Sequence, residues 1–165
     1  MSIATTYQGS HLEFGVTCER NVMVPMRDGV RLATDIYFPA TDGQRANGSF
    51  PLLLERTPYN KASPPLVNAG KYFDRRSYVC AFQDVRGRFA SDGEWYPFAK
   101  EAPDGHDTVE WLGSQDWSSG KVGTIGDSYA LTWYTCPTKH PRAACLTETQ
   151  AGLHANIRTR DTTSR

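Results

Sequence analysis

The sequence has no excess of charge of either sign. Its 18 lysines and arginines are balanced by 18 aspartates and glutamates, so the formal net charge at pH 7 is +0. Domains that bind nucleic acid or anionic lipid usually carry a basic excess on one face. The charge balance therefore favours neither kind of partner, and we expect no nucleic-acid or membrane interaction.

The sequence also lacks long apolar runs and paired cysteines. No stretch approaches the ~18 apolar residues that a membrane-spanning helix needs, and the first residues, MSIATTYQGSH, have neither the basic nor the apolar region of a secretory signal. The cysteines show no CxxC spacing, which is typical of scattered thiols in a reducing compartment. We therefore expect a cytoplasmic protein. The cysteines are Cys18, Cys80, Cys136 and Cys145.

What the sequence does contain is enough apolar material for one folded domain. The chain has 165 residues, of which 39% are hydrophobic and 22% charged, a balance typical of globular domains. Residues 1–19 are polar and are interpreted as a loosely ordered lead-in. Residues 20–150 are expected to form the domain, and 151–165 a polar tail.

Two apolar runs near the N-terminus meet at Asp28-Gly29, which is a strong hairpin signal. In the second run apolar and polar residues alternate from Val30 to Phe38, the period of a half-buried strand. The polar segment 40–49 is expected to be a loop, and Asp104 or Asp107 is expected to cap a helix in the segment 101–113.

Further along, buried strands are expected at 51–55 and 78–82, helices at 66–76 and within 101–113, and a short strand at 122–126, after a loop at 114–121. A hairpin followed by alternating strands and helices predicts an α/β fold. Its sheet is expected to be mainly parallel, with the antiparallel hairpin at its N-terminal end.

The segment 123–130, GTIGDSYA, places Ser128 directly after the last of these strands. In α/β-hydrolases a nucleophilic serine lies on a sharp turn of this kind, with small residues such as Gly126 and Ala130 beside it. A lone Gly-x-Ser is weak evidence, because a serine at the start of a helix is more often a cap.

Several other segments strengthen the catalytic interpretation. PMRDGVRLATDIYFP, LLLERTPYNK, QDVRGRFASDGEWYPF and EAPDGHDTVEWLGSQDWSSGKVGTIGDSYA occur in this order over about residues 20–135. Together they resemble the N-terminal part of the cocaine esterase/Xaa-Pro dipeptidyl-peptidase-like family. The resemblance implies a partial α/β-hydrolase fold and a serine hydrolase of esters or amides that works through an acyl-enzyme, without metal or organic cofactor.

The resemblance also implies roles for three residues. Ser128 matches the nucleophile, and Tyr129 matches the residue whose backbone N–H binds the oxyanion. Tyr59, in RTPYNK, matches the tyrosine whose hydroxyl is the second oxyanion donor, although taken alone it would be an ordinary loop aromatic. A phenol fixed at the end of a rigid sheet can direct one strong donor at developing negative charge.

The segment QDVRGRFASDG receives no chemical role, and Asp84 and Arg86 are expected to be an ion pair or to brace the loop. The acidic residues around His106 invite a metal site, but helix capping and solvated charge explain them better. No metal site is therefore expected. The residues concerned are Asp104, His106, Asp107 and Glu110.

Two features depart from the family pattern. Leu131 occupies a position where the family commonly has glycine, and the acid and the histidine that should follow Ser128 have no convincing match. Glu148 and His154 stand in the right order, but they are too close in sequence to come from two separate loops. His140 would lie at the far end of a short helix.

We therefore expect a hydrolase by descent whose catalysis is impaired for want of these two partners. Two alternatives stay open: a decayed fragment without catalysis, and a half-site that a second chain completes. An incomplete sheet would also leave an exposed edge, so self-association is expected.

Overall fold

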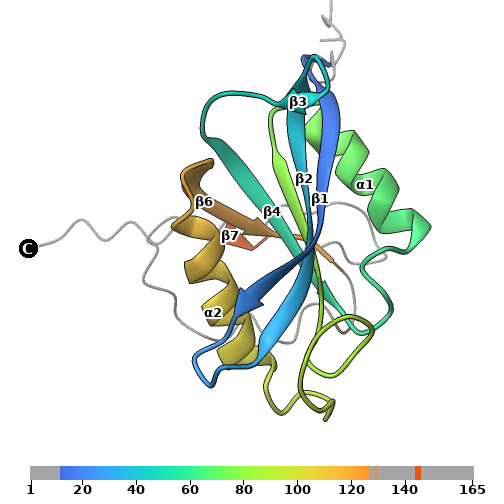
Figure 1. Ribbon diagram of the computed structural model, residues 1–165, viewed down its shortest axis with the longest axis vertical. Helices are drawn as coiled ribbons and strands as arrows, with labels where there is room; N and C mark the ends of the chain where they lie inside the picture. Colours follow the sequence, from blue (N-terminus) through green and yellow to red (C-terminus); the bar gives the residue numbers. More distant parts are fainter. Residues whose placement is uncertain (1–11, 127–128, 130–143, 146–165) are drawn as a thin grey trace, which may run out of the picture.

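The computed structural model describes residues 12–126, Tyr129 and 144–145. One mixed sheet runs through this part, with strand order β1-β2-β5-β4-β6-β7 and the short β3 paired to β2 (Figure 1). The strands are β1 (Gly15–Pro25), β2 (Arg31–Thr41), β3 (Gln44–Arg45), β4 (Phe50–Thr57), β5 (Val79–Asp84), β6 (Ser118–Thr124) and β7 (Ala144–Cys145). The predicted α/β fold is confirmed.

The N-terminal hairpin forms where the sequence predicts it. β1 and β2 are antiparallel from Gly15↔Ala40 to Pro25↔Arg31, and the turn between them has Gly29 at a φ of 84°. β1 begins inside the predicted lead-in 1–19. The predicted boundary at residue 150 and the tail 151–165 lie outside the described residues.

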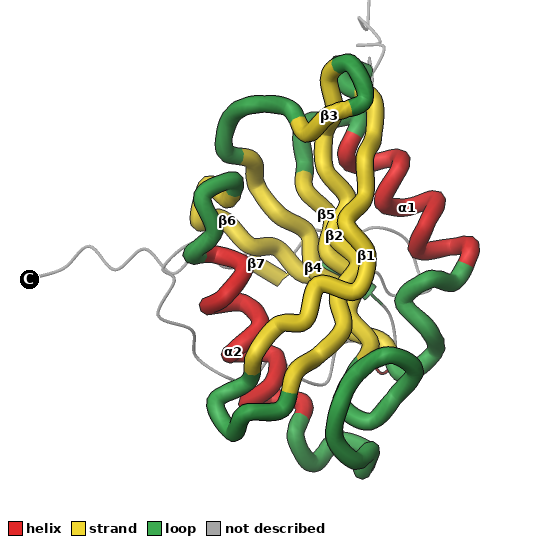
Figure 2. Tube along the Cα trace, viewed as in Figure 1, coloured by secondary structure: helices red, strands yellow, loops and turns green. Residues whose placement is uncertain are grey.

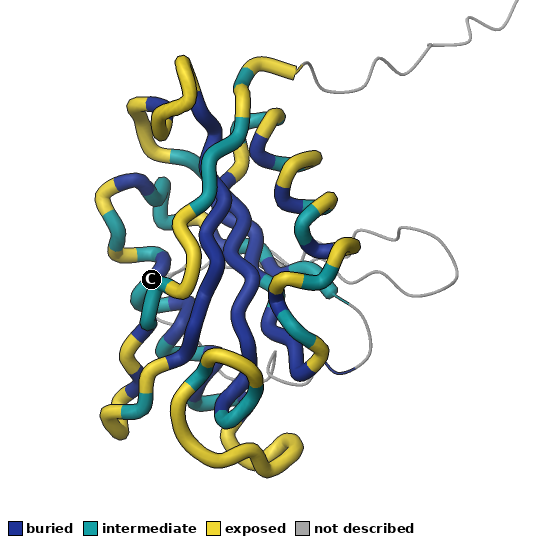
Figure 3. The backbone as a smooth tube through the Cα atoms, turned by 45° about the vertical axis from the view of Figure 1, so that its right-hand side comes forward, coloured by how far each residue is buried: buried dark blue, intermediate teal, exposed yellow. Residues whose placement is uncertain are grey.

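The prediction that β2 is half-buried is wrong. From Leu32 to Ala40 both faces of this strand are buried, because β2 lies between β1 and β5 and helices cover the sheet on both sides (Figure 3). Asp35, on the face predicted to meet solvent, is 1% exposed. Its charge is met at 3.1 Å by Arg20 and at 3.6 Å by Lys61.

The two helices lie on opposite faces of the sheet. α1 (Pro64–Asp74) follows β4, and α2 (Glu101–Gly113) follows β5 (Figure 2). Leu66 of α1 packs with Tyr37 and Phe82 on one face. Val109 and Leu112 of α2 pack on the other face, with alternate residues of the same strands.

Gly70, at the centre of α1, lies where the helix packs closely on the sheet. A Cβ at this position would lie 3.0 Å from Cγ of Tyr37 and 3.1 Å from Cε2 of Phe82. Even a methyl group would therefore require the ring of Tyr37 or Phe82 to shift by a few tenths of an ångström. Glycine here is a packing residue.

Three local expectations need correction. Neither Asp104 nor Asp107 caps α2, whose N-cap is Lys100 without a side-chain hydrogen bond. The predicted loop 40–49 contains β3, and the predicted loop 114–121 contains the start of β6. Among the described residues, no helix is long and apolar enough to cross a membrane.

Candidate active site

The candidate site lies at the carboxyl ends of β4 and β6. These strands are parallel neighbours, with Leu54 opposite Thr124. The chain passes from β4 through α1 to β5 on one side of β4, and then through α2 to β6 on the other side. Such a reversal of direction opens a crevice at the carboxyl edge of an α/β sheet, where ligands bind. The loops that carry Tyr59 and Tyr129 both start at this edge (Figure 1).

The backbone changes conformation just after β6. The N–H of Ile125 still donates to the carbonyl of Leu54 at 3.0 Å, but Gly126 then adopts a φ of 138°, which a residue with a side chain rarely adopts. β6 itself ends at Thr124, four residues before Ser128. Ser128 itself and Leu131 lie outside the described residues, as do Glu148, His140 and His154.

Tyr129 is anchored through its side chain. It is 8% exposed, and its hydroxyl donates to Oε1 of Glu101 at 2.9 Å and accepts from the N–H of Phe98 at 3.1 Å. The ring of Phe98 stacks on that of Tyr129 with centroids 4.7 Å apart. Burial and the Glu101 carboxylate raise the pKa of Tyr129, so the phenol stays protonated and remains a donor.

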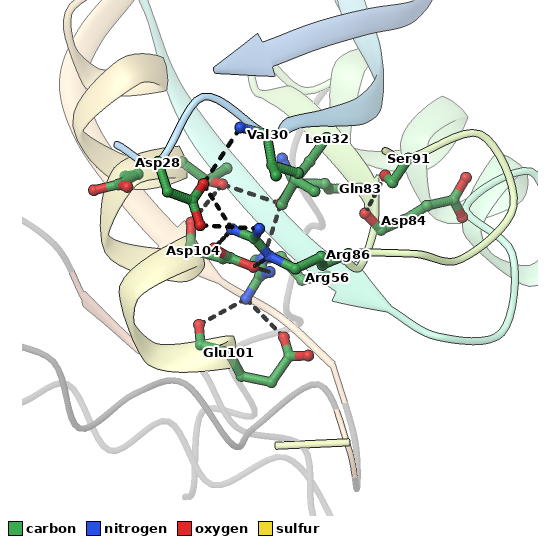
Figure 4. A network of polar contacts seen from close by, with 12 residues as sticks. Asp28, Val30, Leu32, Arg56, Gln83, Asp84, Arg86, Ser91, Glu101 and Asp104 are labelled. Carbon is green, nitrogen blue, oxygen red and sulfur yellow. Dashed lines mark hydrogen bonds and ion pairs between the residues drawn. The ribbon is translucent and has the colours of Figure 1, made fainter. Parts of the chain in front are cut away.

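Glu101 is the first residue of α2, and its carboxylate meets a fully buried arginine. Nη1 of Arg56 lies 2.9 Å from Oε2 of Glu101, with side-chain exposures of 0% and 4%. Arg56 also donates through Nε to Oε1 of Gln83 at 2.8 Å and through Nη1 to the Glu101 carbonyl at 2.9 Å (Figure 4). Burial lowers the pKa of Arg56, while Glu101 and Asp104 act in the opposite direction.

The same network reaches across the sheet and into α2. Gln83 donates to Oγ1 of Thr34 at 3.0 Å and accepts from Oγ1 of Thr108 at 3.0 Å. Each of these side chains is 0% exposed. The polar groups beneath Tyr129 therefore come from β2, β4, β5 and α2, and most of them pair with one another, as is usual for buried polar groups.

Tyr59 is held differently, by its backbone. It is 69% exposed, its N–H donates to Oγ1 of Thr57 at 3.1 Å, and the next residue, Asn60, has a φ of 84°. Lys61 then fixes the loop, because both its N–H and its ammonium bind the carboxylate of Asp84, at 2.8 and 3.1 Å. The phenol is therefore presented to solvent from a braced loop.

Asp84 and Arg86 do brace this region, as expected, but they do not pair with each other. Asp84 binds Lys61, whereas Arg86 lies 2.6 Å from Asp104 and 3.0 Å from Asp28 (Figure 4). These two carboxylates raise the pKa of Arg86. A further brace comes from Arg88, whose Nε donates to the carbonyl of Pro58 at 3.2 Å.

Two of the acidic residues near His106 pair with arginines. Asp104 binds Arg86, and Asp107 binds Arg27 at 2.6 Å. Burial acts to raise the pKa of Asp107, but the hydrogen bonds from Arg27 outweigh it and the pKa is lowered. In the described part of the chain, no group of three or more His, Cys, Asp or Glu is placed to hold a metal ion.

Comparison with known proteins identifies the family. The model of the X-Pro dipeptidyl-peptidase (S15) family matches residues 28–156. The chain belongs to this family. Cocaine esterase of Rhodococcus sp. (strain MB1 Bresler) is 45% identical over 113 residues, which make up 66% of this chain and 19% of that protein.

Solved structures agree with this S15 assignment. An α-amino acid ester hydrolase is 29% identical with a TM-score of 0.65, over 89% of this chain and 28% of its own. An aminopeptidase from a marine sediment archaeon, Thaumarchaeota archaeon, is 26% identical with a TM-score of 0.66, over 90% and 28% of the two chains. The predicted resemblance and the partial α/β-hydrolase fold are both confirmed.

The chain spans about a fifth of the length of the curated relatives that it matches; its match with cocaine esterase covers 19% of that protein. The matched part includes the hairpin turn, the loop with Tyr59 and the segment with Ser128. The names of the relatives cover both ester and peptide bonds.

Sequence reasoning missed Arg56 and Glu101. Arg56 ends the apolar run LLLER and Glu101 opens a helix rich in acidic residues, so each has the pattern of an exposed charge. One signal was available. A strand covered on both faces cannot carry an unpaired charge, so an arginine inside β4 requires a buried acidic partner.

Proposed function

We propose that this S15 chain forms part of a serine hydrolase that cleaves carboxylic esters or amides through an acyl-enzyme. Ser128 attacks the carbonyl carbon, and the electron pair of the C=O bond moves to the oxygen. The Tyr59 hydroxyl and the Tyr129 N–H receive that oxyanion. The C=O bond then re-forms as the bond to the alcohol or amine breaks, and this leaving group takes the proton that Ser128 gave to a base. Water hydrolyses the acyl-enzyme in the same way, which releases the acid and restores the Ser128 hydroxyl.

The observation that carries this proposal is the common origin of the two oxyanion loops. Tyr59 follows β4 and Tyr129 follows β6, and these parallel strands end at the same edge of the sheet. Donors fixed on rigid elements cost no reorganisation when charge develops, and each is worth about 10²–10³ in rate.

An acyl-enzyme route also needs a general base, most often a histidine. Of the four histidines, His106 is the one described, and its Nδ1 lies 3.2 Å from Nη2 of Arg27, on the face of α2 near the hairpin. Its ring is therefore engaged with the hairpin turn. We propose that an acid and a histidine outside the described residues, from this chain or a second one, complete the relay. Cytoplasmic location and self-association stay predictions.

The experiment is covalent labelling of the full chain by a fluorophosphonate, followed by intact mass, with Ser128→Ala as the negative control. The fluoride leaves as Ser128 oxygen bonds to phosphorus, so one adduct is expected. A folded chain without adduct would refute a site that is complete in this chain, and would favour a decayed fragment or a half-site that a second chain completes.

The role of Tyr59 is tested by Tyr59→Phe. Loss of one oxyanion donor is expected to slow labelling about 100-fold. Because the side chain is 69% exposed, the free energy of unfolding should change by less than about 0.5 kcal/mol. Tyr72→Phe on α1, 53% exposed, removes the same hydroxyl far from the site and should label at the wild-type rate.

A further inference from the structure

Tyr129 differs from Tyr59 in being fixed from within the protein. Its phenol reaches Glu101 at 2.9 Å, and Glu101 is in turn fixed by Arg56 at 2.9 Å, with both side chains almost fully buried. The residue that follows the proposed nucleophile is therefore tied to the core at the far end of its side chain.

This tie matters because an oxyanion donor acts through its direction. A backbone N–H points where the peptide plane points, and holding the end of a stiff side chain narrows the range of orientations that this plane can adopt. Tyrosine has few rotatable bonds. A phenol held at one oxygen and stacked at 4.7 Å on Phe98 therefore limits the orientations open to the Tyr129 peptide.

We propose that Glu101 and Arg56 are positioning residues that set the oxyanion hole by fixing the phenol of Tyr129. The proposal rests on the proposed function, because it assigns the Tyr129 N–H to the oxyanion. Neither residue touches the substrate. Glu101 acts through Tyr129, and Arg56 acts through Glu101.

The charges of the network suit this role. A bare carboxylate near a developing oxyanion would oppose catalysis, but the Arg56 guanidinium at 2.9 Å neutralises Glu101. Arg56 is itself held in place by Gln83 at 2.8 Å. Phe98 adds a second bond to the phenol by donating its N–H at 3.1 Å, from a backbone with a φ of 66°.

The test is Tyr129→Phe in the full chain, which keeps the ring and the Arg56–Glu101 pair but removes the hydroxyl. Fluorophosphonate labelling is expected to slow about 10- to 100-fold, the scale of a small misplacement in an active site. With a soluble nitrophenyl ester, kcat should fall while KM stays near its wild-type value. Tyr37→Phe, which removes a buried hydroxyl on the α1 face, should change neither quantity.

A second variant separates position from folding. Glu101→Gln keeps an amide oxygen that can accept from the phenol, so it should lose less labelling rate than Tyr129→Phe, even though it weakens the pair with Arg56. Labelling of folded Tyr129→Phe at the wild-type rate would overturn the proposal. So would a larger loss in a folded Glu101→Gln variant.

Hydrogen–deuterium exchange keeps the two proposals apart. Peptides covering 126–132 should exchange faster in Tyr129→Phe than in wild type if the phenol fixes this segment. If wild type takes no label, a site complete in this chain is refuted, but exchange still decides the positioning. Equal exchange in both proteins would refute the positioning role whatever the labelling shows.

Discussion

A buried carboxyl at the end of α1 makes the stability of this domain depend on pH in an unusual direction. Asp74 is 0% exposed, and among the described residues neither of its oxygens has a hydrogen-bond partner of good geometry. Burial raises the pKa of Asp74 to about 8 from 3.8, although the nearby thiol and N–H of Cys80 act to lower it. The folded protein therefore holds this proton at neutral pH.

The sign of the effect follows from proton binding. Between pH 3.8 and about 8 the unfolded chain has released the proton and the folded chain has not, so the contribution of Asp74 to stability falls as pH rises. It is greatest below pH 3.8 and is lost once pH passes about 8. The fall is at most about 1.4 kcal/mol per pH unit.

Over the whole interval the fall is of the order of 5 kcal/mol, which is comparable with the total stability of a small domain. Asp74→Asn has the same shape and cannot ionise. We therefore expect the variant to exceed the wild-type free energy of unfolding by about 1 kcal/mol at pH 4.5 and by several kcal/mol at pH 8. Burial also raises the pKa of Cys80 well above 9.0, so that thiol does not titrate in this range.

The assay is urea unfolding of both proteins, followed by circular dichroism from pH 4.5 to pH 9. All other carboxyls are common to the two proteins, so the difference between the two free energies isolates Asp74. Asp116→Asn, at an exposed position, is the matched control and should give a difference that stays flat. A flat difference for Asp74→Asn would refute the reasoning.

Two further substitutions test the packing and the loop. Gly70→Ala should lower the free energy of unfolding by about 1–3 kcal/mol, even though alanine favours the helix by about 1 kcal/mol. The control Lys71→Ala, on the exposed side of α1, should be near neutral. A stabilised Gly70→Ala variant would show that α1 can move and would contradict the prediction. Lys61→Met leaves Asp84 buried without its cation and should cost about 3–5 kcal/mol. Chemical denaturation measures it, and a loss below about 1 kcal/mol would contradict the bracing role.

The elements of the fold were predictable because each is determined by its own residues. The Asp28-Gly29 turn and the apolar run before Arg56 fix their strands through local pattern and conformational preference. The burial of β2 was not predictable in this way. Asp35 follows the pattern of an exposed residue, and only the folded chain brings Arg20 and Lys61 to it.

The residues of the site also fall into two groups, those that a local motif reveals and those that only the fold brings together. Ser128, Tyr59 and Tyr129 stand in motifs that can be recognised as a string. The Arg56–Glu101 pair joins residues 45 positions apart, and no motif links them. Contacts between residues so far apart depend on where α2 lies on the sheet. The sequence predicts that this helix forms, but not where it packs.

The two proposed oxyanion donors therefore depend on the fold to different degrees. Tyr59 reaches the site from an exposed loop, so removing its hydroxyl should alter chemistry while leaving stability intact. Tyr129 is held by a buried network that also joins β4 and β5 to α2, so weakening that network should alter both. A hydrolase that takes one donor from a loop and the other from its core can change its loop with little cost to folding. The network beneath Tyr129 has no such freedom, because any change to it acts on the sheet and on the site together.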